Sequence, residues 1–114
     1  MTIIYGIHNC DTVKKAITWL NKQEISFTFH DFRKDGLSET LLKEFFTNCD
    51  WQLLLNKRST TYRNLPDEIK NNLNEDNIFK AILEQPTLLK RPVLAHNQQL
   101  NLGFKPEQYQ ELFS

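Results

Sequence analysis

Apolar residues change their spacing several times along the chain, and the changes predict an alternation of strands and helices. The first stretch, Thr2–Tyr5, is β-branched and aromatic and ends at a glycine, which is typical of a short buried strand. Apolar residues then recur at helical spacing to about Lys22, which predicts a helix with Asp11 or Thr12 as its N-cap. Alternation returns over Ile25–Phe32 and predicts a second strand.

The central part of the chain, from about residue 38 to residue 88, predicts helices and no strand. Ser38 is a good N-cap, and the helix expected after it has an apolar face made by Leu41, Leu42, Phe45 and Phe46. Further helical patterns cover Trp51–Leu55, Pro66–Leu73 and Asp76–Glu84. The basic, Ser- and Thr-rich segment Asn56–Arg63 is expected to be a polar loop.

The last part of the chain predicts a hairpin and a closing helix. Val93–His96 is a short apolar strand, Asn97 and Gln98 make a turn, and residues 100–102 form the partner strand. A helix is expected over Pro106–Phe113. The order is therefore β-α-β, helices, then β-β-α, which is the plan of an α/β thioredoxin-like fold with a helical insertion between its two halves. With no repeat and no linker, we expect a single domain over residues 1–114 with the insertion at about 38–88.

Composition excludes several classes of protein. The chain has 114 residues, and 14 basic side chains balance 14 acidic ones, so no net positive field attracts nucleic acid or anionic lipid. No apolar segment approaches the ~20 residues that a membrane span needs. The N-terminus lacks the features of a signal peptide, so we expect a cytoplasmic protein with reduced thiols.

Cys10 lies where the first strand gives way to the first helix. The backbone N–H groups and the positive end of the helix dipole at such a position favour a thiolate and can hold an oxyanion. Lys14, and His8 if protonated, would add positive charge, whereas Asp11 opposes it. The position alone leaves a reactive thiol and a buried packing residue about equally favoured.

The remaining residues exclude other common chemistry. Val13 stands where a Cys-x-x-Cys motif would have its second cysteine, and Cys49 ends a helical pattern with no turn or cap, which favours a structural role. His30 and His96 have no partner at metal-ligand spacing, so we expect no metal site. The chain has no Gly-rich phosphate loop.

Two arginines are candidates for an anion site. Arg91 directly precedes Pro92, and an X-Pro bond in a tight turn is where cis peptide bonds occur. Pro92 is at the first position of a strand, which tolerates its missing N–H donor, and Arg58 lies in the polar segment. Two guanidiniums near one thiolate would bind an anion through bidentate hydrogen bonds. The alternative is that both are solvated surface side chains.

Four segments together resemble the ArsC (arsenate reductase-related) family, most closely its YffB-like branch, and the resemblance extends over nearly the whole chain. They are Tyr5–Lys15 (YGIHNCDTVKK), Asp31–Leu37 (DFRKDGL), Leu54–Arg63 (LLNKRSTTYR) and Lys90–Leu94 (KRPVL). The resemblance implies a thioredoxin-like fold in which Cys10 is the nucleophile and Pro92 a cis-proline. It also implies that Arg58 and Arg91 bind an oxyanion, and we expect Thr12 and Lys14 to assist them.

The resemblance leaves three functions open. Arsenate reductases of this family carry a third arginine after the hairpin, where this chain has Leu102–Phe104 followed by Lys105. The favoured function is therefore a glutathione-dependent thiol reductase, ahead of a glutaredoxin-coupled arsenate reductase and of a non-enzymatic regulator like Spx, a family member that binds RNA polymerase. We expect a monomer that uses glutathione as co-substrate, with glutaredoxin as a further partner, and no tightly bound cofactor, nucleic acid or membrane.

Overall fold

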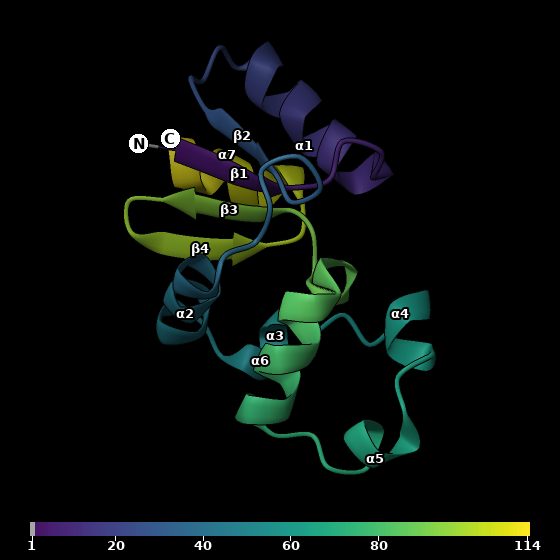
Figure 1. The fold of residues 1–114 in the computed structure, drawn as a ribbon. Coiled ribbons are helices and arrows are strands. Elements are labelled where there is room, and N and C mark those ends of the chain that lie inside the picture. Colours follow the sequence, from purple (N-terminus) through teal and green to yellow (C-terminus); the bar gives the residue numbers. More distant parts are fainter. Residues whose placement is uncertain (1) are drawn as a thin grey trace. The chain divides into compact units, whose positions relative to one another are not determined.

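The computed structural model of the chain describes residues 2–114. Its elements follow the order β1 (Thr2–Gly6), α1 (Asp11–Lys22), β2 (Thr28–Asp31), α2 (Glu39–Asn48), α3 (Trp51–Leu54), α4 (Thr60–Arg63), α5 (Asp67–Lys70), α6 (Glu75–Glu84), η1 (Pro86–Leu88), β3 (Val93–His96), β4 (Gln99–Leu102) and α7 (Pro106–Phe113). Figure 1 shows these elements along the chain.

The chain divides into two compact units. The first unit runs to Gly36 and resumes at Arg91, and the second is the segment Leu37–Lys90 between them. This segment contains helices and corresponds within two residues to the expected insertion at 38–88. The expectation that residues 1–114 form a single domain stays a prediction.

The first unit is built on a four-stranded sheet with the order β2-β1-β3-β4. β1 pairs in parallel with β2, with Gly6 opposite Asp31, and antiparallel with β3, with Tyr5 opposite Val93. β3 and β4 form the expected hairpin, whose turn residues Asn97 and Gln98 have positive φ. This order of elements and strands confirms the prediction of a thioredoxin-like α/β fold.

One apolar cluster joins the sheet of the first unit to α1 and α7. Ile4 and Leu94 of the sheet, Ala16 and Leu20 of α1, and Tyr109 of α7 are all completely buried in it. Trp19 packs edge-on against Tyr109, with 5.6 Å between ring centroids, so the two helices are held together by an aromatic contact as well as by the sheet.

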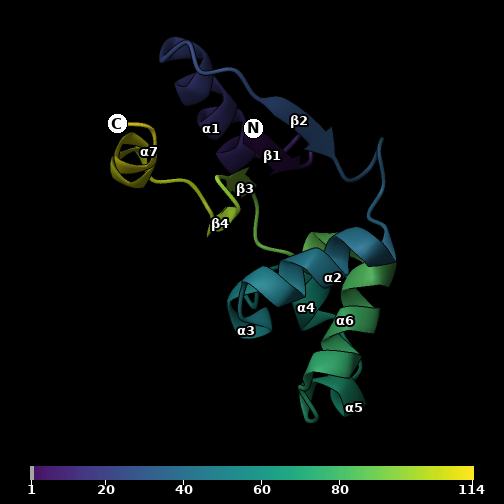
Figure 2. The same ribbon diagram turned by 90° about the vertical axis from the view of Figure 1, so that its left-hand side faces the viewer.

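The second unit consists of helices and one isolated bridge. Ser38 caps α2 by accepting a hydrogen bond from the backbone N–H of Leu41 at 3.1 Å, as predicted. α2 and α6 lie side by side (Figure 2). The rings of Phe46 and Phe79 meet edge-on between them, with 5.2 Å between ring centroids. A backbone bridge between Leu55 and Leu89 joins the residue after α3 to the residue after η1.

Several predicted boundaries were wrong, because local geometry decided them. β2 begins at Thr28 rather than at Ile25, since the backbone N–H of Ile25 closes the end of α1 by donating to Leu20 at 3.0 Å. The predicted helix over residues 66–73 covers only Asp67–Lys70. The polar segment expected to be a loop contains the short helix α4, which Ser59 caps.

No helix among residues 2–114 combines the length and apolar character that a membrane span requires.

Candidate functional site

Cys10 is the N-cap residue of α1. Its backbone is extended (φ −98°, ψ 124°), and its carbonyl accepts the first intrahelical hydrogen bond, from Lys14 at 3.0 Å. The prediction that Asp11 or Thr12 caps this helix was therefore wrong, and both lie inside its first turn. The first backbone N–H groups of α1 have no intrahelical partner. The half-buried thiol of Cys10 lies beside them and forms no capping hydrogen bond with them.

Packing of α1 against the end of β1 fixes where the helix starts. Val13 is completely buried, and a Cβ atom added to Gly6 would lie 2.7 Å from Val13 Cγ2. Only a glycine at position 6 leaves room for this contact. Val13, the third residue after Cys10, thus packs against the strand. Within the described part of the first unit, Cys10 is the only cysteine.

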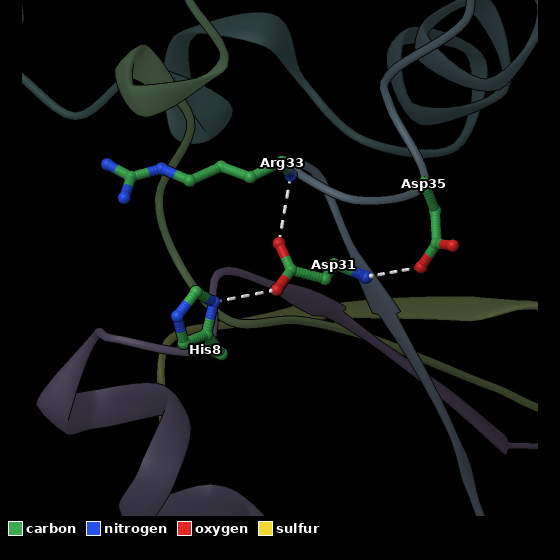
Figure 3. Close-up of polar contacts among 4 residues, drawn as sticks. All are labelled: His8, Asp31, Arg33 and Asp35. Carbon is green, nitrogen blue, oxygen red and sulfur yellow. Dashed lines mark hydrogen bonds and ion pairs between the residues drawn. The ribbon is translucent and has the colours of Figure 1, made fainter.

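A buried carboxylate lies beside the loop that leads to Cys10 (Figure 3). Asp31, at the end of β2, is only 2% exposed. One of its oxygens accepts from the Nδ1–H of His8 at 3.0 Å, and the other accepts from the backbone N–H of Arg33 at 2.8 Å. Asp35 in turn accepts from the backbone N–H of Asp31 at 3.0 Å.

The hydrogen bonds to Asp31 keep its carboxylate ionised. Burial raises the pKa of Asp31, but hydrogen bonds from the backbone N–H of Arg33 and from His8 lower it further than burial raises it. The net pKa lies below its ordinary value. Sequence reasoning missed the Asp31–His8 pair. A signal was present, because Asp31 alternates with Phe27 and Phe29 along the predicted strand and a charged residue on an apolar face needs a partner.

Arg91 and Pro92 enter β3 at the end of the sheet where β1 ends. Pro92 directly precedes Val93, the register partner of Tyr5, and the predicted cis bond between Arg91 and Pro92 is present. Within residues 2–114, the Nε and Nη1 atoms of Arg91 are buried and have no hydrogen-bond partner. A guanidinium with unsatisfied donors is suited to hold an anion. That Arg91 points at Cys10 stays a prediction.

The other predicted anion-binding residues fall in two places. Thr12 and Lys14 are exposed in the first turn of α1, in the same unit as Cys10. Arg58 is exposed in the second unit, just before the N-cap of α4, where its backbone N–H donates to Asn56 Oδ1 at 3.1 Å. Its convergence with Cys10 therefore stays a prediction.

The second cysteine, Cys49, has different surroundings. It is the half-buried C-cap residue of α2. Burial, together with the charge of Asp50, raises its pKa above the ordinary value, against a smaller opposite effect of Lys90. This environment favours the unreactive thiol form. Within residues 2–114, no cluster of three or more His, Cys, Asp or Glu side chains is placed to hold a metal ion.

A sheet of this order, a lone cysteine at the start of α1 and a cis-proline at the entrance to β3 define a thioredoxin-like protein with a helical insertion. The model of the ArsC family matches residues 5–112, and the chain belongs to this family.

Individual relatives agree with this assignment. A protein of Haemophilus influenzae is 43% identical over 114 residues, which is 100% of both chains. The structure of the YffB (PA3664) protein is 36% identical, with a TM-score of 0.94 over 100% of both chains. That of an arsenate reductase (ArsC) related protein from Brucella melitensis is 43% identical, with a TM-score of 0.81 over 99% of this chain and 94% of that one. The global transcriptional regulator Spx of Lactiplantibacillus plantarum is 27% identical over 95% of this chain and 83% of its own.

Proposed function

We propose that this protein is a thiol–disulfide reductase that uses Cys10 as its nucleophile and glutathione as its co-substrate. The observation that carries the proposal is the position of Cys10 at the N-cap of α1, beside backbone N–H groups that its side chain leaves free. Such a position favours a thiolate, and the thiolate is the attacking species in thiol–disulfide exchange. Membership in the ArsC family supports an oxidoreductase role of this kind.

The reaction would proceed in two exchanges. The Cys10 thiolate attacks the glutathione sulfur of a mixed disulfide, so that a bond forms between Cys10 and glutathione while the substrate thiolate leaves and takes up a proton. A second glutathione thiolate then attacks this new disulfide and releases the Cys10 thiolate and oxidised glutathione. One mixed disulfide and one glutathione thus become one free thiol and one glutathione disulfide.

Glutathione carries two carboxylates, and the first unit offers two cationic side chains and a hydroxyl donor. Arg91 has two buried donors without a partner within residues 2–114, and the ammonium of Lys14 and the hydroxyl of Thr12 lie in the first turn of α1. We propose that these residues hold the carboxylates, with Arg58 contributing from the second unit. The proposal includes a cytoplasmic monomer without a tightly bound cofactor, and glutaredoxin as a further redox partner.

Two matched variants test the proposal. Cys10→Ser is expected to abolish reduction of a mixed disulfide of glutathione and a small thiol, assayed as production of glutathione disulfide. Cys49→Ser is expected to retain it, because Cys49 lies in a setting that favours the thiol. Equal rates for Cys10→Ser and the wild-type protein would refute the proposal.

Arsenate reduction is the second candidate, and the unpaired donors of Arg91 are the observation that favours it. A tetrahedral oxyanion is a good acceptor for a guanidinium fork. This candidate predicts arsenite production that needs glutathione and glutaredoxin and is lost in Arg91→Ala. Absence of arsenite with the wild-type protein would exclude it.

A regulatory role without catalysis is the third candidate, since relatives at 27% identity are named as the regulator Spx. It predicts that the protein is retained by the C-terminal domain of the RNA polymerase α-subunit in a pull-down. No retention would exclude this particular partner.

A further inference from the structure

We propose that Asp31 is a positioning residue for the reaction at Cys10: its buried carboxylate anchors the loop that precedes Cys10 and holds the His8 imidazole in a single tautomer. The inference rests on the proposed thiol-exchange function and adds Asp31 to the residues that serve it.

Strand register brings Asp31 to this loop. The parallel pairing of β1 and β2 places Gly6 opposite Asp31, and the backbone N–H of Phe32 donates to the Gly6 carbonyl at 2.8 Å. The loops that follow the two strands therefore start side by side. His8 is the second residue after Gly6 and the second before Cys10, so a group that fixes His8 also fixes the entrance to α1.

The Asp31 carboxylate is paired with the His8 side chain, since its Oδ2 atom lies 3.0 Å from His8 Nδ1. His8 also contributes to lowering the pKa of Asp31. In Figure 3 the guanidinium of Arg33 extends away from Asp31, and only its backbone N–H reaches the carboxylate. His8 therefore supplies the one side-chain partner drawn for this carboxylate.

The chemistry of the pair selects the tautomer of His8. An ionised carboxylate accepts hydrogen bonds and cannot donate them, so Nδ1 of His8 must carry the hydrogen. In the neutral imidazole this leaves Nε2 as the atom with the free lone pair. The His8 side chain is 58% exposed, whereas that of Asp31 is 4% exposed. A buried carboxylate therefore fixes an imidazole whose ring is accessible to solvent.

This arrangement gives His8 a defined task in the exchange. In the proposed scheme Nε2 would take the proton of the Cys10 thiol before attack and return it to the substrate thiolate that leaves, so no proton is gained or lost in the step. Asp31 acts only through His8 in this scheme, because it fixes the ring and stabilises the imidazolium between the two transfers.

A double-mutant cycle tests whether Asp31 acts through His8. Asp31→Asn, His8→Gln and the double variant are compared with the wild-type protein by turnover of the mixed disulfide and by the rate of Cys10 alkylation with iodoacetamide, with Cys49 of the same chain as the internal standard. Asp31→Asn is expected to slow turnover at least ~10-fold, and the double variant to be no slower than His8→Gln alone. Independent, multiplicative losses, or an unchanged rate in Asp31→Asn, would overturn the inference.

His30→Gln is the matched control, because His30 neighbours Asp31 in β2 but donates to the Gly36 carbonyl at 2.7 Å rather than to the carboxylate. It perturbs the same strand and is expected to keep the Cys10 rates. Rates as low as those of Asp31→Asn would show that any disturbance of β2 suffices, and would also overturn the inference.

The protonation of the two ring nitrogens of His8 provides a measurement that would not change if Asp31 had only a structural role. Correlation of ring protons with ¹⁵N is expected to show the Nδ1–H tautomer in the wild-type protein and the Nε2–H tautomer in Asp31→Asn. An Nε2–H tautomer in the wild-type protein would refute the inference even if Asp31→Asn failed to fold. If the wild-type protein turned over no mixed disulfide, the proposed function would fail, while the tautomer and the alkylation rates would still decide the role of Asp31.

Discussion

The contact between Gly6 and Val13 is the packing feature that places Cys10 at the start of α1, and a pair of substitutions tests it. Gly6→Ala adds a methyl group at a position where it would lie 2.7 Å from Val13 Cγ2 and 3.3 Å from Cγ1. Real Cβ contacts are longer, and Val13 is completely buried, so either its side chain or the helix must move. Val13→Ala removes the obstructing methyl groups.

The structure gives the expected magnitudes. Overpacking of a dense core costs about 1–3 kcal/mol, so Gly6→Ala should destabilise the protein by that amount. Val13→Ala removes buried apolar groups worth about 0.8 kcal/mol per methylene and leaves a cavity, so about 2 kcal/mol should be lost. In the double variant the new methyl group occupies the space that Val13 vacates. The double variant should therefore be more stable than the sum of the single effects by at least ~1 kcal/mol.

Urea unfolding followed by far-UV circular dichroism measures all four proteins, and iodoacetamide alkylation of Cys10 reports on the start of α1. Gly6→Ala should slow alkylation because displacing Val13 disturbs the first turn of α1, whose N–H groups lie beside the thiol, and the second substitution should restore the rate. Wild-type stability in Gly6→Ala, or additive losses in the double variant, would refute the packing argument.

Three further predictions concern single groups. Because the pKa of Asp31 is lower in the folded protein, its carboxylate stabilises the fold above the unfolded pKa of ~3.9, and that contribution is lost as acid takes the pH down through the folded pKa. In acid titrations monitored by fluorescence, Asp31→Asn should consequently lose less stability than the wild-type protein between about pH 5 and pH 2. Ser38→Ala removes the cap of α2 and should cost about 1 kcal/mol in urea unfolding, whereas an unchanged midpoint would contradict the cap. Tyr109 is buried, and burial raises its pKa strongly; since no hydrogen-bond partner of its hydroxyl is found within residues 2–114, Tyr109→Phe should keep or raise the thermal midpoint.

The sequence predicted the order of elements well, because each element carries a local signal. Four features each depend on a few neighbouring residues: the apolar spacing of α1, the apolar spacing of α7, the Ser38 cap and the Asn97-Gln98 turn. The insertion between the halves also followed from local patterns, since no alternating segment interrupts it. Local propensity is sufficient for features of this kind.

The features that depend on contacts between distant segments could not be predicted in this way. Cap preference favoured Asp11 and Thr12, but the burial of Val13 against Gly6 starts the helix one residue earlier, with Cys10 as the cap. The pairing of His8 with Asp31 spans 23 positions and needs the parallel register of two strands. Side-chain types indicate that a charge on an apolar face needs a partner, and only the register identifies that partner.

The contact between Val13 and Gly6 also bears on why the proposed reaction uses one cysteine and an external thiol. A second thiol three residues after Cys10 would occupy the position of Val13, whose two methyl groups pack against Gly6, and a cysteine has only one γ atom to fill that space. Cys49 is a poor substitute as a resolving thiol, because burial and the neighbouring Asp50 raise its pKa and so reduce its thiolate fraction. An external thiol has neither restriction. A chain built in this way would form a mixed disulfide with glutathione at Cys10 rather than an internal disulfide, and this is the intermediate that the proposed mechanism requires.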